Sequence, residues 1–339
     1  MKRILIAFAC GLPFILHAQT STPYMQKSFP RDAVHQLVAQ TSGGNISVSA
    51  EPGEARVEVY IRSNNGHEIS KEEIQQRLNE QFDLTVDLEG GVLKAIAKHK
   101  VRDINWNRTL SISFVIHSPS AVSSSLKTSG GNIDLKGLSG NEDFKTSGGN
   151  LSLAGLSGKI TGRTSGGNVS IDDSKDNIDL QTSGGNMSAK HCEGTIRLET
   201  SGGNLDITDV KGSIKATTSG GHVGGSNVAG ELQARTSGGN IDFDNMTGSL
   251  AASTSGGNIH VVINPAKFID LSNSGGNITL ELPKDKGMDL NISGDQVHST
   301  AMTNFKGDVD KHRISGSLNG GGIPVKVDGN GGSVHLSFR

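Results

Sequence analysis

The side chains best suited to metal binding form one acidic run. Asp172, Asp173 and Asp176 lie close together in the sequence, and closely spaced carboxylates in a loop are typical calcium ligands. Calcium takes six or more oxygen ligands, however, and this run does not recur in the neighbouring sequence repeats described below. The pattern therefore favours a solvated acidic turn, with calcium binding as the alternative.

A histidine and a cysteine lie side by side at His191 and Cys192. A reactive thiol needs a partly exposed, electropositive setting. Cys192 falls at position eleven of the repeat, where five other copies carry the apolar residues Leu138, Leu156, Val210, Val228 and Met246. We therefore expect a buried, inert thiol, and a His191 side chain that is solvated at a turn.

Motifs typical of enzymes are missing from the sequence. No nucleophile-elbow, zinc-protease or phosphate-loop pattern occurs; His67-Glu68, for instance, has Lys71 where a zinc protease needs its second histidine. Polysaccharide hydrolysis is the one enzymatic alternative, and it needs a carboxylate pair and sugar-stacking aromatics in a cleft. The aromatic residues suited to that task, Trp106, Tyr24 and Tyr60, all lie outside the repeats. We therefore predict that the protein is not an enzyme, and assign no catalytic, cofactor-binding or metal-ligating residue.

An 18-residue repeat organises the central part of the chain. Thr-Ser-Gly-Gly recurs every 18 residues, starting at Thr128, Thr146, Thr164, Thr182, Thr200, Thr218, Thr236 and Thr254. An altered copy at Asn273 comes one residue late, and an isolated earlier copy starts at Thr41. A fixed period of this kind is typical of stacked units that bury their apolar faces against their neighbours.

Apolar and polar residues alternate within each repeat, counted from its threonine as position one. Positions six and eight are apolar in Leu205 and Ile207, with Asp206 between them, and positions fifteen and seventeen repeat this in Ile196 and Leu198. Alternation with a period of two predicts strands with one buried face. We therefore predict an all-β fold: a parallel β-helix or β-solenoid with 18-residue coils and two short strands in each coil, capped by irregular β segments.

Two turns should connect the strands of each coil. One falls at the Gly-Gly-Asn of positions three to five, and the other near position thirteen, which is glycine in most copies. The alternation points each threonine inward, where we expect its hydroxyl to bond the threonine one coil away. The asparagines are expected to stack as an amide ladder. Neighbouring coils should lie about 4.8 Å apart.

The segments on either side of the repeats differ from them. Residues 29–127 hold strand-like runs and a capping box, Ser70-Lys71-Glu72-Glu73, that predicts a short helix through about Gln81. Residues 128–282 form the regular coils, and residues 283–339 a C-terminal β cap that ends in a strand. Both outer segments are suited to cover the open sheet edges of a solenoid.

The first residues predict export. Residues 1–18 have the positive start, apolar stretch and small final residue of a secretory signal peptide, and a linker over 19–28 follows. Lipidation at Cys10 would require a longer apolar run before it, so we expect no lipid anchor. No other segment is long enough to span a membrane. The net charge of −2 provides no electrostatic footprint for nucleic acid. The expected location is the periplasm, the outer-membrane surface or the extracellular space.

Several motifs together resemble the bacterial putative-adhesin family, a domain of unknown function. They are the Thr-Ser-Gly-Gly-Asn repeats, the Ser-Ile-Ser-Phe-Val-Ile-His-Ser-Pro strand at 111–119, the three glycines at 320–322, and Gly-Gly-Ser-Val at 331–334. The resemblance covers about residues 30–339, although the repeat is more regular here than in the family. It implies an exported β-solenoid with an envelope or adhesive role, and supplies no ligand or site residues.

Two functions remain open on this basis. The protein is either a surface adhesin or structural binding module with an unknown ligand, or a periplasmic module that acts in envelope assembly or stress signalling through a protein partner. Ice binding would need the threonines to face outward, whereas the alternation places them inside.

Overall fold

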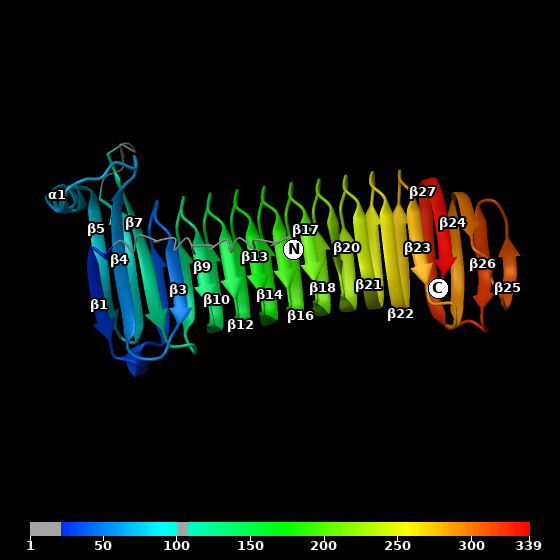
Figure 1. Cartoon of the computed structure of the whole chain (residues 1–339), viewed down its shortest axis with the longest axis horizontal. Helices are drawn as coiled ribbons and strands as arrows, with labels where there is room; N and C mark the ends of the chain where they lie inside the picture. Colours follow the sequence, from blue (N-terminus) through cyan, green and yellow to red (C-terminus); the bar gives the residue numbers. More distant parts are fainter. Residues whose placement is uncertain (1–21, 101–107) are drawn as a thin grey trace, which may run out of the picture.

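The structure is a computed structural model that describes residues 22–100 and 108–339. Its strands stack into a long rod, with helix α1 (Lys71–Gln81) at the N-terminal end and the last strands at the other (Figure 1). The expected signal peptide over 1–18, Cys10 and Trp106 lie outside the described residues. The all-β solenoid predicted from the repeat is confirmed.

Each regular coil consists of a four-residue strand and a seven-residue strand, stacked in parallel as two sheets. Residues 18 apart face each other, as Leu151 does Val169 and Ile178 does Ile196. The four-residue strands are β9 (Ile133–Lys136), β11 (Leu151–Ala154), β13 (Val169–Asp172), β15 (Met187–Lys190), β17 (Leu205–Thr208) and β19 (Val223–Ser226). The seven-residue strands are β10 (Ser139–Lys145), β12 (Ser157–Arg163), β14 (Lys175–Gln181), β16 (Glu193–Glu199), β18 (Lys211–Thr217) and β20 (Ala229–Arg235).

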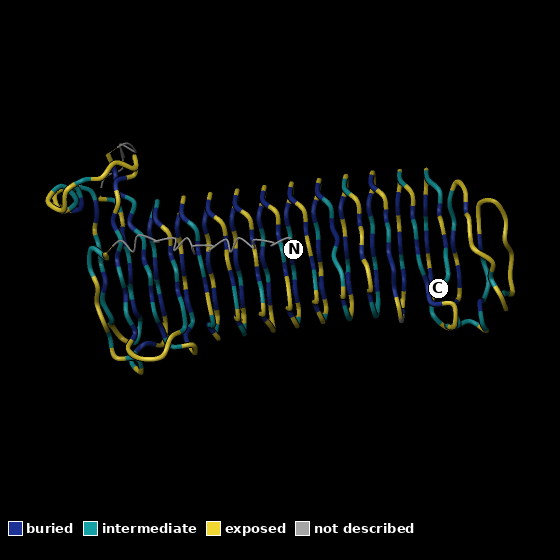
Figure 2. The backbone as a smooth tube through the Cα atoms, viewed as in Figure 1, coloured by how far each residue is buried: buried dark blue, intermediate teal, exposed yellow. Residues whose placement is uncertain are grey.

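The core follows the predicted alternation. Leu205 and Ile207 are buried, and Asp206 between them is exposed; Figure 2 shows the same change from buried to exposed along each strand. Some inward positions depart from the pattern. Glu142 stands at position fifteen, where the next coil has Ile160, and its side chain is only 1% exposed. Ser174 at position eleven and the first threonine of each coil are also buried. The core is therefore mainly apolar, with buried polar groups along the rod.

The Thr-Ser-Gly-Gly-Asn motif joins the coils through backbone hydrogen bonds. The Thr146 hydroxyl donates to the Gly131 carbonyl of the preceding coil at 2.8 Å and accepts from the Gly149 amide of its own coil. The asparagine side-chain oxygens accept from the backbone amide one coil later, as Asn132 does from Asn150. We predicted hydrogen bonds from threonine to threonine and from asparagine to asparagine side chains, and both predictions were wrong. The side chains bond to backbone groups of the neighbouring coil instead, because those groups lie closer.

The second glycine of the motif is required by the close approach of successive coils. A Cβ atom added to Gly149 would lie 1.9 Å from the Gly131 carbonyl oxygen. That distance is far inside van der Waals contact, so no other residue fits at this position. The motif is thus explained by turn geometry and coil stacking.

The copy at Thr41, expected to be isolated, is part of the stack. Strands β2 (Gln36–Gln40) and β3 (Ile46–Ala50) pair in parallel with β8 (Ser123–Lys127) and β9. The Thr128 hydroxyl donates to the Gly44 carbonyl, and the Asn132 amide donates to the Asn45 side chain, as between later coils. The chain between them forms the N-terminal cap and returns, so the distance in sequence hid this contact.

The N-terminal cap contains the expected helix and strands. The Ser70 hydroxyl accepts from the Glu73 amide at the start of α1, which confirms the capping box. The cap strands are β4 (Ala55–Ser63), β5 (Phe82–Glu89), β6 (Val92–His99) and β7 (Leu110–Ser118). A 3₁₀ turn over Arg31–Ala33 precedes them. Strand β1 (Met25–Phe29) overlaps residues 25–28 of the expected linker and pairs antiparallel with β4, so the linker prediction was wrong there. A strand of this length gives no clear periodic signal in the sequence.

The C-terminal end repeats this arrangement. Strands β21 (Ile241–Thr254), β22 (Ile259–Asn273) and β23 (Ile278–Leu282) continue the stack, and register shifts between β21 and β22 absorb the extra residue before Asn273. Strand β27 (Ile323–Phe338) adds a last coil by pairing with β22 and β23. The cap strands are β24 (Met288–Ser299), β25 (Phe305–Val309) and β26 (Arg313–Leu318).

Candidate functional site

One row of residues forms the sharp turn between the two sheets. Position ten adopts positive φ in consecutive coils, at Asp173, His191, Asp209, Asn227 and Asn245, with φ between 49° and 57°. Asparagine and aspartate tolerate this conformation better than most residues. The row is linked by side chains, since Asn245 donates to Asn227 and Asn227 donates to Asp209. The turn therefore presents a line of polar groups along the rod.

His191 lies at the centre of the acidic part of this row. Its Nδ1 is 2.8 Å from an Asp172 oxygen and 3.7 Å from an Asp173 oxygen, and its Nε2 is 3.7 Å from an Asp209 oxygen. The hydrogen bond to Asp172, with the charges of the three carboxylates, raises the pKa of His191 above its ordinary value. His191 is exposed as predicted, but it belongs to the acidic cluster, which the sequence did not indicate.

Asp176 does not share the site with Asp172 and Asp173. It takes the place of the position-thirteen glycine, with φ of 81°, and its carboxylate accepts from the Gly158 amide at 2.9 Å. The three aspartates considered as calcium ligands are thus divided: Asp172 and Asp173 lie at the turn, whereas Asp176 lies in strand β14. The turn expected near position thirteen falls at position ten instead. The ligand atoms of Asp172, Asp173 and His191 do lie within 4.8 Å of one another, as do those of Asp242, Asp244 and His260.

The chemistry of these two clusters differs from that of a calcium site. Calcium prefers an all-oxygen set of six or more ligands, whereas imidazole with carboxylates suits a transition metal. The side chains of Asp172, Asp173 and His191 are 46%, 73% and 54% exposed, and the Asp172–His191 hydrogen bond already satisfies Nδ1. A satisfied, solvated ion-pair cluster accounts for this geometry without a metal.

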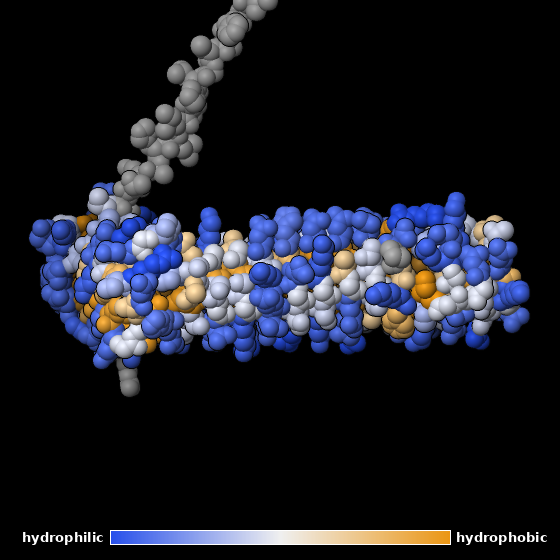
Figure 3. Space-filling model, turned by 90° about the horizontal axis from the view of Figure 1, so that it is seen from below, coloured by the Kyte–Doolittle hydropathy of each residue, from blue (hydrophilic) through white to orange (hydrophobic). Residues whose placement is uncertain are grey.

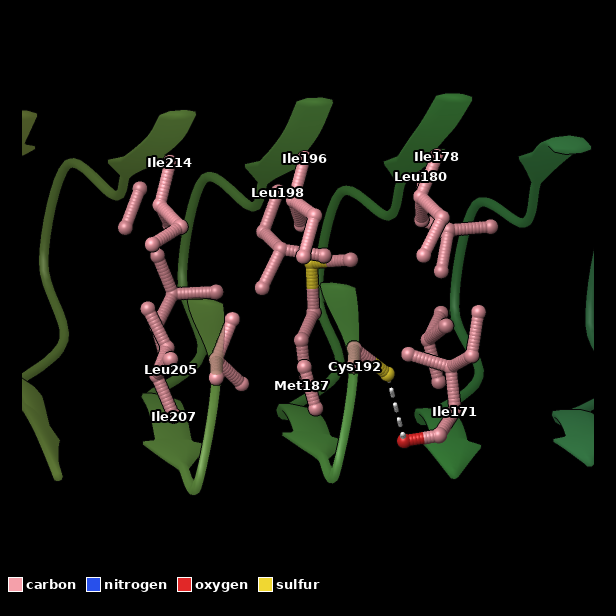
Figure 4. Close-up of a cluster of buried hydrophobic side chains, with 14 of the residues drawn as sticks. Ile171, Ile178, Leu180, Met187, Cys192, Ile196, Leu198, Leu205, Ile207 and Ile214 are labelled. Atoms are coloured by element: carbon pink, nitrogen blue, oxygen red, sulfur yellow. Dashed lines mark hydrogen bonds between the residues drawn. The ribbon is translucent and has the colours of Figure 1, made fainter. Parts of the chain in front are cut away.

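Cys192 is buried beneath this turn. The thiol is 1% exposed, and its Sγ lies 3.0 Å from the Lys190 carbonyl and 3.9 Å from that of Ile171 (Figure 4). Burial raises the pKa of the thiol, so the thiolate is not favoured near neutral pH. The expected buried thiol is confirmed, and its surroundings offer no route to nucleophilic chemistry.

A continuous polar face runs along the sheet of four-residue strands. Its residues occupy position seven and its equivalents, which pair in register from strand to strand and are exposed or half-buried apart from Gly224. This polar face consists of Val115, Ser47, Asp134, Ser152, Ser170, Ser188, Asp206, Gly224, Asp242, His260, Thr279 and His335. Short side chains keep the face flat, so a ligand could contact many coils at once.

A shallow groove of about 380 Å³ lies at the N-terminal end of the polar face. Tyr60 and Arg62 of β4, Ser111 and Ser113 of β7, and Asp134 of β9 are among its lining residues. Burial raises the pKa of the Asp134 carboxyl, and its hydrogen bond with Ser152 partly offsets this. The sequence places Tyr60 outside the regular repeats. It gives no sign that β4 and β7 extend the sheet of four-residue strands.

The outer surface is largely hydrophilic. Seen from below in Figure 3, hydrophilic residues cover both long sides of the rod, and hydrophobic surface shows between them, with the larger patches toward the two ends. Among the residues that the structure describes, Phe268 and Val309 are the large hydrophobic side chains that are exposed, at 39% and 55%. Within the same ranges, no helix has the length and hydropathy that a membrane span requires.

Comparison with solved structures includes a wide but weak alignment. It pairs 93% of this chain with 98% of the chain in the crystal structure described as a putative cell adhesion protein from Clostridium sporogenes. The TM-score is 0.20 and the sequence identity is 10%. No curated protein matches the chain in sequence.

A family model gives the firmer result. The Toastrack DUF4097 model matches residues 168–337, which span half of the chain and include the coils from Asn168 to the final strand β27. The matched region holds the regular repeat and the C-terminal cap described above. The chain therefore belongs to the Toastrack DUF4097 family.

Proposed function

We propose that the protein is an exported, non-enzymatic β-solenoid of the cell envelope that acts at the surface as an adhesin or structural binding module. The observation that carries the proposal is the polar face, in which residues from twelve strands share one register. A flat, rigid row of hydroxyl and carboxylate groups suits contact with an extended ligand. Export is supported by the signal-peptide pattern of residues 1–18.

The absence of a catalytic role is also part of the proposal. The two titratable clusters on the regular coils consist of solvated side chains that pair with one another, and the one free cysteine in the described ranges is buried. The grooves are shallow and open, whereas enzymes enclose substrate in a cleft that excludes water.

A periplasmic module that acts through a protein partner is the second candidate. The observation in its favour is strand β25, which pairs only with β26 among the described strands and carries the exposed Val309. An open edge can accept a strand from another protein. Glycine at 307 and the charged Lys306 and Asp308 make this edge less suited to pairing, so we place this function second.

Selective proteolysis of cells separates the two functions. A specific protease site inserted after Gly66 lies in an exposed turn, where an added Cβ would meet nothing within 4 Å. Cleavage of intact cells is expected for a surface protein. Cleavage only after the outer membrane is permeabilised would contradict the surface role and support the periplasmic one. A known periplasmic protein serves as the control for membrane integrity.

Blocking the polar face tests whether that face binds. Ser152→Arg with Ser188→Arg adds two bulky cations to the polar face, whereas Thr195→Arg with Ser213→Arg adds the same charge to the opposite sheet. We expect the first pair to reduce attachment of cells to surfaces, and the second pair to leave attachment unchanged. Equal attachment by both pairs would show that the polar face is not the binding surface.

A further inference from the structure

Three cations line up on the sheet of seven-residue strands, opposite the polar face. Lys127, Lys145 and Arg163 end strands β8, β10 and β12, and they pair in register, Lys127 with Lys145 and Lys145 with Arg163. All three side chains are exposed. Because neighbouring strands lie about 4.8 Å apart, this basic stripe extends about 10 Å along the rod.

The cations of the basic stripe form no ion pairs among the residues that the structure describes. Of the acids nearby, Asp179 and Glu199 are bound by Arg197, and Asp143 lies two residues from Lys145 on the exposed side of β10 without pairing with it. Like charges directly opposite each other on neighbouring strands repel. The folded protein therefore holds three positive charges in a line, none of them in an ion pair, which favours the arrival of a negatively charged ligand.

A groove beside the basic stripe adds hydrogen-bonding groups. It has a volume of about 260 Å³, and Arg163, Ser165, Ser183 and Ser201 line it together with Glu199. The threonine of each coil points inward, so the serine that follows points outward beside position eighteen, which is the cation Arg163 in the case of Ser165. Serine hydroxyls both donate and accept hydrogen bonds, which suits a ligand that carries hydroxyl groups as well as acidic ones.

We propose that the basic stripe binds an acidic polysaccharide, with its carboxylate or sulfate groups against the three cations and its hydroxyls against the serines. Nucleic acid fits less well, because Phe144 of β10 is buried and offers no surface for base stacking. A flat membrane fits less well, because Asp143 and Asp179 flank the stripe and would also meet the lipid headgroups. A linear polymer, unlike a flat membrane, can contact the three cations without covering the aspartates beside them. This inference rests on the proposed surface-binding role and adds a ligand class for a second surface.

Binding of polygalacturonate to the purified full-length mature protein tests the inference, with dextran as the neutral polymer. The stripe variant combines Lys127→Gln, Lys145→Gln and Arg163→Gln. The matched control combines Lys190→Gln, Lys211→Gln and Lys215→Gln, three exposed lysines that do not form one line, and it lowers the net charge equally. We expect the stripe variant to lose at least about tenfold in affinity and the control less than about twofold. Raised salt should weaken wild-type binding, and dextran should not bind.

Other outcomes would overturn the inference. Absence of wild-type binding, equal loss in both variants, or tighter binding to anionic phosphatidylglycerol vesicles or to single-stranded DNA would each exclude an acidic polysaccharide at the stripe. Circular dichroism of both variants checks that they fold. The binding assay uses purified protein, so a negative result would not bear on whether the protein lies at the cell surface. Conversely, protection from protease on intact cells would contradict the surface role but not the binding of an acidic polysaccharide.

Discussion

The side-chain oxygen of Asn132 accepts a 2.8 Å hydrogen bond from the backbone amide of Asn150, its counterpart one coil further along the chain. The same bond recurs between later coils, for example from Asn168 to Asn150 and from Asn186 to Asn168. It satisfies a backbone donor at the turn, where no strand partner is available. The asparagine ladder therefore ties each turn to its neighbour and sets the orientation of successive coils.

Removal of one asparagine should lower the stability of the array. Asn168→Ala deletes the acceptor for the Asn186 amide, and we expect a loss of about 1 kcal/mol in the free energy of unfolding. Ser170→Ala, two residues away on the polar face, is the matched control and should change little. Denaturant unfolding of both variants measures the difference. Equal midpoints for the two variants would mean that the ladder does not stabilise the fold.

The buried Glu142 should destabilise the N-terminal part of the stack. The Ser124 hydroxyl donates to one of its carboxylate oxygens, and the other has no partner among the described residues. Replacing both residues, with Ser124→Ala and Glu142→Ile, removes the unsatisfied group and should stabilise the protein by about 1–3 kcal/mol. The matched control is Glu231→Gln on the exposed side of β20, which should have little effect. A lower melting temperature for the double variant would contradict this account.

The same carboxyl should make stability depend on pH. Burial raises the pKa of Glu142 above its ordinary value, so the folded chain retains a proton that the unfolded chain releases. Stability should therefore decline as the pH rises from the ordinary range of glutamate through the raised pKa. The advantage of the double variant over the wild type should grow over that interval. An advantage that is constant with pH would show that Glu142 does not titrate in this way.

The pKa of His191 should depend on Asp172 and not on Asp176. Because the Asp172 hydrogen bond is the largest cause of the raised pKa, Asp172→Asn should lower it toward the ordinary histidine value. Asp176→Asn should leave it unchanged, since the Asp176 carboxylate accepts from the Gly158 amide of the neighbouring strand β12. NMR titration of the His191 ring measures both shifts. An equal decrease in the two variants would restore the three-aspartate cluster suggested by the sequence.

The regular coils could be predicted because each carries the whole pattern. Alternation at Leu205, Asp206 and Ile207 is local, and it fixes which side of a strand faces inward. The burial of Cys192 followed from the apolar residues at the same position in other coils. These inferences need only the period and the residue types.

Features that depend on contacts distant in sequence could not be predicted. The coil at Thr41 stacks on that at Thr128 only because the N-terminal cap returns the chain to the same place. His191 joins Asp172 and Asp209 because three consecutive turns adopt the same left-handed conformation. A charged residue such as Glu142 is expected to face solvent. Its side chain faces inward because β10 pairs in register with β8 and β12.

Deletion of one coil tests the central claim, that the 18-residue coil is the structural unit, most directly. Removing residues 200–217 takes out β17 and β18 together and joins Glu199 to Thr218, which leaves every inward side chain inward. Removing residues 200–216 leaves one residue extra, which must slip the register or form a bulge. We expect the 18-residue deletion to melt at the higher temperature although it loses more chain. Equal or greater stability of the 17-residue deletion, or aggregation of both, would contradict the stacked-coil architecture.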